Sequence, residues 1–375
     1  MNHKVYFKLI EYPGGWKDTA ADWLHLFKRC DRPCMFYHPL FIEAAQVLPA
    51  NIAPTHVVLG YQDNVLVFGV PIRLESYWSF LTKISFFSGP FFAHLAPLDS
   101  TPGWTASKGF FTDIKSRYPQ AIIQGDHLED GYTKFLLQDI GPEKQFKVFS
   151  RPSWRCLYLS LPKNPEDLLN NLSGKFRYNI RSSLKKAENA GIEFRILTRA
   201  RQGYDFVNAF DNLMRIYEAR SKSVNRVDNF VGSGLDQYYK TICKLGEKSD
   251  DTLMFAEALH QGEVIASDFG FFTRNAHYGQ IQGFLPEYGK FSIGTLLMYQ
   301  KMLALIEREV PIFDFLMGTV SYKHSWTQKV DKNFNVLLST TSFRSRAAFE
   351  WLCLQQSRER QGGLSWLKYR LTGRS

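Results

Sequence analysis

The segment that most limits how this chain folds is AHYGQIQGFLPEYGKFSIGTLLMYQKMLALIEREVPIFDFL, residues 276–316. Its pattern predicts a strand, a glycine-containing loop, a helix and a second strand, in that order. Gly289 and Gly294 relax the backbone of the loop, and Ser292 or Thr295 stands near the first turn of the helix. The apolar residues of the helix then pack it on a sheet, so we expect an α/β protein.

The loop and the start of this helix have the chemistry of an anion site. N–H groups at a helix N-terminus lack partners within the helix, and a loop without bulky side chains leaves them accessible to a pyrophosphate. Lys290 adds a cation beside them. Two glycines before a helix also serve turn geometry alone in many proteins, so the loop by itself leaves both interpretations open.

The strand and helix pattern occurs twice along the chain. The first part shows helical spacing over 18–29 and 39–48, strands over 55–61 and 65–74 around a polar turn, a helix over 104–118 and a strand at 121–125. The second part shows a strand after 153, a basic helix that begins near 172, with Ser173 as N-cap and Gly191 as stop, helices over 204–221 and 234–245, and a β-meander over 252–284. The pattern predicts two copies of one α/β unit, residues 1–152 and 153–375, although any α/β protein contains strand–turn–strand segments.

Three pieces of the second part carry a resemblance to a known family: LSGKFRYNIRSSLKKAENAG, YGKFSIGTLL and FDFLMGTVSYKHSW. GFLPEYGKFSIGTLL resembles the acyl-CoA-binding motif of GNAT (N-acetyltransferase) enzymes, although Tyr288 and Gly289 stand where that motif has Gln or Arg. The chain is most similar to the CelD-like branch, found near cellulose and exopolysaccharide genes. It is more distantly similar to Fem-type aminoacyl transferases, which hold two GNAT units in one chain. The resemblance implies a tandem GNAT fold of class α/β, with mixed, mostly antiparallel sheets flanked by helices.

The resemblance also implies where the acyl donor binds. Strand 280–284 is expected to splay from its neighbour, so that a backbone N–H faces the thioester carbonyl. We expect no donor site in the first half, because FFSGPFFAHLAPL has no glycine-spaced loop that opens into a helix. The residues expected to contact the donor are Gly283, Phe284, Tyr288, Gly289, Lys290, Ser292, Ile293, Gly294 and Thr295.

The general base stays open among several residues. Asp314 and Asp268 are the first candidates, since a carboxylate within an apolar strand is costly to bury and is either functional or half of a salt bridge. Gln280 and Glu287 are further candidates, and we expect His277, which begins its strand beside a turn, to be exposed. In the resembling family the Tyr322–Lys323 pair lies near the active centre, where a tyrosine hydroxyl protonates the leaving thiolate or orients the acceptor. The alternative for Lys323 is an ordinary solvated loop.

The net charge of +10 favours a polyanionic ligand. Arg177, Arg181 and Lys185 recur every four residues on one face of the basic helix. With Lys323, these arginines are our candidates for binding a phosphate-bearing acceptor, although most charged helix faces simply face solvent.

We therefore predict an acyltransferase that moves an acyl group, most simply acetyl, from acyl-CoA to an amine or hydroxyl of a sugar or polysaccharide precursor. The alternatives are a Fem-type transferase that uses aminoacyl-tRNA and a non-catalytic protein that binds acyl-CoA. We expect no metal, because the five scattered cysteines show no ligand spacing, and no nucleic acid other than tRNA. The start of the sequence has no apolar signal region, so we expect a cytoplasmic protein. The basic, aromatic C-terminal end either contacts an anionic membrane surface or docks on the domain.

Overall fold

The computed structural model describes residues 4–89, 92–199, 204–223, 233–248 and 252–358. The chain forms two compact units. Unit 1 comprises residues 1–154 together with 332–375, and unit 2 comprises residues 155–331. The chain leaves unit 1 within strand β7 (Lys147–Ser160) and returns to it within strand β13 (Val330–Ser339).

Unit 1 is built around a sheet whose strands follow the order β1-β2-β3-β4-β6-β13. Its other elements are β1 (Tyr6–Glu11), α1 (Ala20–Arg29), η1 (Met35–Tyr37), α2 (Pro39–Ala44), η2 (Ala45–Val47), β2 (His56–Gln62), β3 (Val65–Tyr77), β4 (Leu81–Phe86), β5 (Leu98–Asp99), η3 (Pro102–Trp104), α3 (Thr105–Arg117), β6 (Ala121–Glu129), α4 (Asp130–Phe135), η4 (Leu136–Ile140), α5 (Gly141–Lys144) and α12 (Phe343–Arg358).

Unit 2 has a sheet in the order β7-β12-β11-β10-β9-β8. Its elements after β7 are α6 (Pro165–Asn170), α7 (Gly174–Asn189), β8 (Ile192–Leu197), α8 (Phe206–Ser223), α9 (Leu235–Gly246), β9 (Leu253–His260), β10 (Glu263–Phe272), β11 (His277–Phe284), η5 (Pro286–Phe291), α10 (Ile293–Ile306), β12 (Ile312–Met317) and α11 (Ser321–His324).

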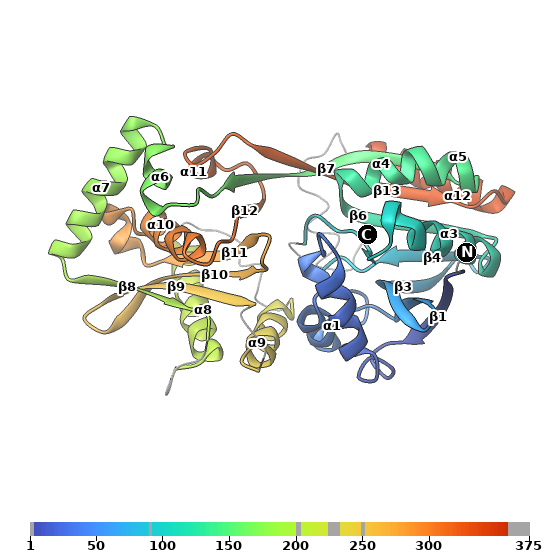
Figure 1. Cartoon of the computed structure of the whole chain (residues 1–375), viewed down its shortest axis with the longest axis horizontal. Coiled ribbons are helices and arrows are strands. Elements are labelled where there is room, and N and C mark those ends of the chain that lie inside the picture. Colours follow the sequence, from blue (N-terminus) through green and yellow to red (C-terminus); the bar gives the residue numbers. More distant parts are fainter. Residues whose placement is uncertain (1–3, 90–91, 200–203, 224–232, 249–251, 359–375) are drawn as a thin grey trace. The chain divides into compact units, whose positions relative to one another are not determined.

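Helices cover both faces of the unit 2 sheet. Figure 1 shows α6, α7 and α10 on one face and α8 and α9 on the other. Helix α10 is apolar along most of its length, and it packs between α7 and strands β8 to β11 in one continuous core. Burying this helix between a helix layer and a sheet removes most of its surface from water, which stabilises the helix far more than its own propensity does.

The two units repeat one connectivity. Each contains, in this order, a strand, two helices, a three-stranded antiparallel meander, a helix and a strand parallel to the last meander strand. In unit 2 the end of β7 and helices α6 and α7 precede this series, which begins there at β8. The parallel pairs differ, however. Strands β4 and β6 pair over four residues, from Thr82↔Ala121 to Ser85↔Gln124. Strands β11 and β12 pair only at His277↔Phe313 and Tyr278↔Asp314.

The boundary between the units near residue 153 lies where the sequence pattern changes. We had expected the C-terminal segment to belong to the second unit, but residues 332–375 belong to unit 1. Strand β13 pairs with β6 of unit 1, from Asn333↔Glu129 to Ser339↔Ile122. Helix α12 then packs its Ala348 and Phe349 against Leu81 and Ile122 of the same unit. The strand with which β13 pairs decides which unit the C-terminal segment joins, and the residues of β13 alone do not specify that partner.

Turn and capping residues in the sequence predicted the ends of several helices and strands correctly. Asp63 and Asn64 adopt positive φ in the turn between β2 and β3, as a tight hairpin requires. Ser173 caps α7 by accepting a hydrogen bond from Phe176 N at 3.4 Å, and Gly191 follows that helix with φ of +72°. Among the described residues, no helix is both long and apolar enough to span a bilayer. The basic, aromatic end beyond residue 358 lies outside the described residues.

Candidate functional site

The unit 2 sheet opens between β11 and β12. After the two pairs at its start, β11 continues to Phe284 alongside β10, without further pairing to β12. Two irregularities accompany the opening: β11 carries an extra residue, Gln280, opposite β10, and β12 shifts its register on β7 between Asp314 and Met317. The predicted splay of strand 280–284 is therefore present, and it leaves one edge of β11 available to an extended ligand.

Asp314 and Lys323 hold the end of β12 in its irregular conformation. Asp314 Oδ1 accepts a hydrogen bond of 2.6 Å from the N–H of Leu316, whose φ is +52°. Lys323 Nζ donates to the carbonyl oxygens of Phe315 and Met317, both at 2.7 Å. The Lys323 side chain is buried, so the alternative of a solvated loop is wrong, and its ammonium faces β12. Burial lowers the pKa of Lys323 to about 8, and the charges of Cys156 and Asp314 oppose that shift.

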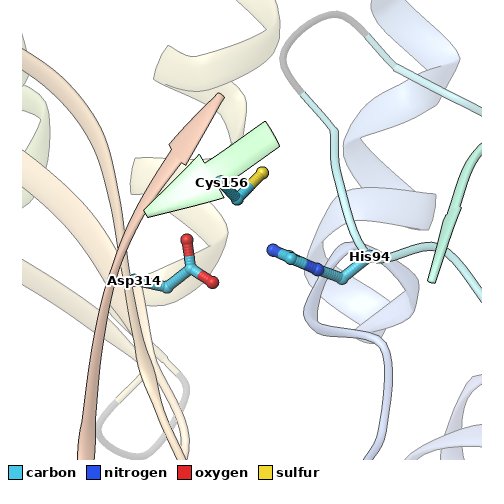
Figure 2. Close-up of side chains that lie close together, drawn as sticks. All are labelled: His94, Cys156 and Asp314. Carbon is cyan, nitrogen blue, oxygen red and sulfur yellow. The ribbon is translucent and has the colours of Figure 1, made fainter. Parts of the chain in front are cut away.

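Cys156 and Asp314 form the polar centre beside this strand end. Figure 2 shows Cys156 on β7 and Asp314 on β12 as neighbouring side chains. The Cys156 sulfur and an Asp314 carboxylate oxygen lie within 4.8 Å of each other, and both side chains are buried. All five cysteines lie among the described residues, and none of them forms a disulfide.

The start of α10 lies at the far end of β11, as predicted. Its first backbone bonds run from Thr295 N and Leu296 N to Ser292 O, at 2.9 and 3.2 Å. The N–H groups of Ile293 and Gly294 precede those bonds and have no acceptor within the helix. Ser292 stands at the N-cap with φ of +53° and makes no capping bond with its side chain. The helix therefore begins with the unpaired N–H groups that an anion site requires.

The glycines of this region serve close packing rather than backbone freedom. A Cβ on Gly294 would lie 3.3 Å from Gln282 Oε1 and 3.4 Å from Phe284 Cδ1, so this glycine lets the first turn of α10 approach β11. A Cβ on Gly283 would lie 3.1 Å from Ile216 Cγ2, so the missing side chain accommodates α8 rather than a ligand. Gly289 has room for a methyl group, with Phe284 Cε2 at 3.6 Å. The left-handed conformation falls on Ser292 instead.

Neighbouring elements anchor the loop on both sides. The Tyr288 hydroxyl lies 2.8 Å from Nδ1 of His260, at the end of β9, which explains a tyrosine where the motif has Gln or Arg. The guanidinium of Arg220 on α8 lies 3.7 Å from the ring centroid of Phe284. Beside the loop, a shallow hollow of about 400 Å³ is lined by Lys186, Asn189, Ala190, Lys290 and Phe291. Two lysines thus flank this end of the splay.

Asp268 belongs to a buried ion pair under α10. Lys301 on α10 is fully buried and bonds Asp268 Oδ1, and Gln282 Nε2 donates to Asp268 Oδ2 at 3.0 Å. The same Gln282 nitrogen donates to Gly294 O at 2.9 Å, which ties the ion pair to the first turn of α10. Burial raises the pKa of Asp268 and lowers that of Lys301, while each charge counteracts the shift of the other.

The expectation that His277 is exposed is wrong. Its ring is fully buried and stacks on Phe313 with centroids 4.6 Å apart. Neither ring nitrogen has a hydrogen-bond partner among the described residues. Burial, assisted by Lys301, holds the pKa of His277 well below its ordinary value, so the ring is neutral. The turn reaches the surface at Arg274, but the chain is buried again from Ala276 onward, so His277 at the start of β11 lies inside.

The two carboxylates predicted as bases lie on opposite faces of the sheet. Asp268 contacts α10, whereas Phe313 next to Asp314 packs in the α10 core, so Asp314 points to the other face. Gln280 also faces that side, because its Nε2 donates to the hydroxyl of Tyr239 on α9 at 2.6 Å. The structure therefore groups Asp314 with Gln280 at the opening and separates both from Asp268.

Helix α7 passes alongside both ends of this site. At its start the ring of Phe176 lies 5.0 Å from that of Trp326, which follows the segment of Tyr322. At its end Lys186 lines the hollow beside the loop before α10. Arg181 and Lys185 are exposed and Arg177 is half-buried, with its Nη1 3.4 Å from Asn170 O. Tyr322 is 45% exposed.

Sequence reasoning missed Lys301, Gln282 and the position of Lys186 beside the loop before α10. Lys301 stands four residues after Leu297 and four before Leu305, both fully buried, so it lies on the apolar stripe of α10. A lysine on such a stripe needs a buried acid, and that spacing was a usable signal. Gln282 and Lys186 carry no comparable signal, because polar residues at those positions also suit exposed surfaces.

Residues 174–324 match the family model described as the acetyltransferase (GNAT) domain. This range contains the open pair of strands, the anion-site loop and α10. Unit 2 has the GNAT fold. No similar sequence was found among curated proteins.

Solved structures extend the likeness from the GNAT domain to most of the chain. FemX is 12% identical, and the match covers 85% of this chain and 95% of FemX with a TM-score of 0.61. A conserved protein of unknown function from Bacteroides thetaiotaomicron is 11% identical, covering 86% of this chain and 97% of that one with a TM-score of 0.56. At such identities the likeness concerns the fold. The predicted class, a tandem GNAT fold of mixed sheets flanked by helices, is confirmed.

Proposed function

We propose that the protein transfers an acyl group from acyl-CoA to an amine or hydroxyl of a sugar or polysaccharide precursor, and that only unit 2 binds the donor. The observation that carries the proposal is the opening between β11 and β12, with the start of α10 at the end of β11. In unit 1 the corresponding strands β4 and β6 stay paired over four residues, so that sheet offers no comparable opening.

The donor's two chemical parts fit two features of the site. The unpaired N–H groups of Ile293 and Gly294, with Lys290 and Lys186 nearby, suit the negative charge of a pyrophosphate. The free edge of β11 suits an extended pantetheine chain, which carries amide groups able to pair with a strand. A backbone N–H on the same edge would polarise the thioester carbonyl.

The residues at the other end of the opening supply proton transfer. The acceptor nitrogen or oxygen attacks the thioester carbonyl carbon; its bond to that carbon forms and the carbon–sulfur bond breaks. In our proposal Asp314 takes the acceptor proton and Tyr322 donates its phenolic proton to the leaving thiolate. Asp268 is the weaker candidate for the base, because both its oxygens bond Lys301 and Gln282 on the α10 face.

We assign Lys323 to positioning rather than to substrate binding. Its ammonium donates to carbonyls of β12, so it maintains the strand end on which Asp314 lies. Arg177 and Arg181 stay our candidates for a phosphate-bearing acceptor, because α7 begins beside the segment of Tyr322. The saccharide acceptor, the acetyl group and the cytoplasmic location rest on the sequence and its resemblance alone.

Isothermal titration with acetyl-CoA and with free CoA tests the donor site. Gly294→Trp fills the contact between α10 and β11 and should abolish binding. Gly174→Ala at the start of α7, where nothing lies within 4 Å of the added Cβ, should bind as the native chain does. The pair Lys186→Glu and Lys290→Glu should weaken binding by at least about tenfold, since it reverses two charges beside the phosphates. Lys163→Glu with Lys244→Glu makes the same charge change at exposed positions elsewhere in unit 2 and serves as its control.

Other outcomes would redirect the assignment. Native protein that binds neither ligand refutes the acyl-CoA proposal and favours aminoacyl-tRNA as donor, which transfer from charged tRNA would then test. Binding that survives Gly294→Trp places the donor elsewhere. Tight binding without turnover on any amine or hydroxyl favours the non-catalytic alternative.

A further inference from the structure

Unit 1 exposes a group of large apolar side chains on two elements that are packed together. They are Trp78 and Phe80 at the β3–β4 turn and Phe343, Trp351 and Leu354 on α12, with exposed fractions of 44%, 47%, 87%, 47% and 57%. We call these five residues the aromatic surface. They account for nearly half of the large apolar side chains that are exposed among the described residues, so the grouping is not ordinary surface scatter.

Helix α12 is apolar on both of its faces. Its inner face packs Ala348 and Phe349 against Leu81, in a small core that also includes Tyr77 of the hairpin. On the outer face, Phe343, Trp351 and Leu354 recur at spacings of eight and three residues and so lie on one side of the helix. Among the described residues of unit 1, nothing covers that side, and a helix needs only one apolar face to pack on its own unit.

The turn between β3 and β4 also exposes aromatic side chains that the fold itself does not require. Trp78 adopts φ of +52°, a conformation that glycine or asparagine takes at lower cost. Its ring stacks on Tyr77 with centroids 4.8 Å apart and lies 6.4 Å from that of Phe80. Turn geometry therefore disfavours the tryptophan, and its exposed ring requires another explanation.

Cations border the aromatic surface. The guanidinium of Arg344 lies 5.4 Å from the Phe80 ring and links α12 to the hairpin turn. Arg346, two residues after Arg344, is exposed. The single acid of α12, Glu350, forms a salt bridge with Lys147. The sequence beyond the described residues adds four cations, Arg360, Lys368, Arg370 and Arg374, against one acid, Glu359. The net charge of the whole region is positive.

We infer that the aromatic surface binds the face of an anionic lipid bilayer. Tryptophan and phenylalanine rings on the outer side of a helix, bordered by arginines, combine apolar insertion with attraction to negatively charged headgroups. The hairpin turn adds a second insertion point fixed to the same helix by the core beneath. This surface belongs to unit 1, whereas the residues proposed for acyl transfer belong to unit 2.

Sedimentation of the full chain with lipid vesicles tests the inference. We expect binding to vesicles of phosphatidylcholine mixed with phosphatidylglycerol and little binding to phosphatidylcholine alone. Phe343→Ser with Leu354→Ser, and separately Trp78→Ser with Phe80→Ser, should each weaken binding about tenfold or more. Val65→Ser with Leu137→Ser removes apolar side chains elsewhere in unit 1 that are about as exposed as Trp78 and Phe80, and should leave binding unchanged.

A charge variant distinguishes electrostatic attraction to anionic lipid from non-specific hydrophobic adsorption. Arg344→Glu with Arg346→Glu should abolish the preference for phosphatidylglycerol, while titration with CoA stays as in the native chain. The inference is overturned if native protein binds neither vesicle, or if it binds both equally. It is also overturned if the serine variants bind like the native chain while Trp366→Ser with Leu367→Ser does not, because the C-terminal end would then be the sole contact.

Discussion

Breaking the buried Asp268–Lys301 pair at one partner should destabilise unit 2 strongly. Lys301 is fully buried and Asp268 is 4% exposed, so neither charge finds water when its partner is removed. Lys301→Met and Asp268→Leu should each lower the free energy of unfolding by about 3–5 kcal/mol near neutral pH, the usual cost of an orphaned buried charge. The double variant should lose less than either single one, because two apolar side chains then pack where two charges were.

The pH dependence of the two single variants gives a sharper test. In Lys301→Met the native Asp268 has a raised pKa, so the native state binds more protons than the unfolded state and stability falls as pH rises above about 4. In Asp268→Leu the native Lys301 has a lowered pKa, so the native state binds fewer protons and stability rises with pH. Each slope reaches at most about 1.4 kcal/mol per pH unit, and the double variant should show neither.

Urea denaturation followed by circular dichroism at several pH values measures all four proteins. The native chain and the double variant provide the matched pair for a double-mutant cycle. The reasoning fails if the losses of the two single variants add in the double variant. It fails equally if the two single variants change with pH in the same direction over the same range.

Three further outcomes follow from the site. Tyr322→Phe should lower kcat about 100-fold or more while the Kd for acyl-CoA stays constant, and equal turnover would remove Tyr322 from proton transfer. Lys323→Met should lower both kcat and stability by disordering the end of β12. In the native chain the pKa of this lysine is lowered from 10.5 to about 8, so its contribution to stability rises between those two pH values, and urea titrations of the variant should lack that rise. Ser292→Gly should raise the free energy of unfolding by up to about 1 kcal/mol, because glycine takes the observed φ of +53° without strain, and a loss of stability would show that the serine side chain stabilises the loop.

Much of the fold was predictable because its signals are local. The cap at Ser173, the stop at Gly191 and the turn at Asp63 and Asn64 depend on a few neighbouring residues, and each lies where its sequence indicated. The loop before α10 was predictable for the same reason, since glycines, a lysine and an apolar helix adjoin in the sequence.

Predictions that depended on a side chain's surroundings fared differently. His277 looked exposed beside a turn but stacks in the core. Lys323 was a candidate for substrate binding, with a solvated loop as the alternative, but its ammonium bonds the carbonyls of β12. Asp268 and Asp314 looked alike, each within an apolar strand. Only the sheet and α10 put them on opposite faces, because the bulge at Gln280 and the partner Lys301 come from other strands and helices.

The sequence by itself determined many of the helices and strands, the loop before α10 and the repeated plan, because each arises from propensities and apolar spacing within a short window. The tertiary structure alone decided that β13 joins unit 1, that β11 and β12 separate after two pairs, and that Lys301 neutralises Asp268. Those outcomes depend on which distant segments pair, and that choice minimises the free energy of the whole chain rather than of any one segment.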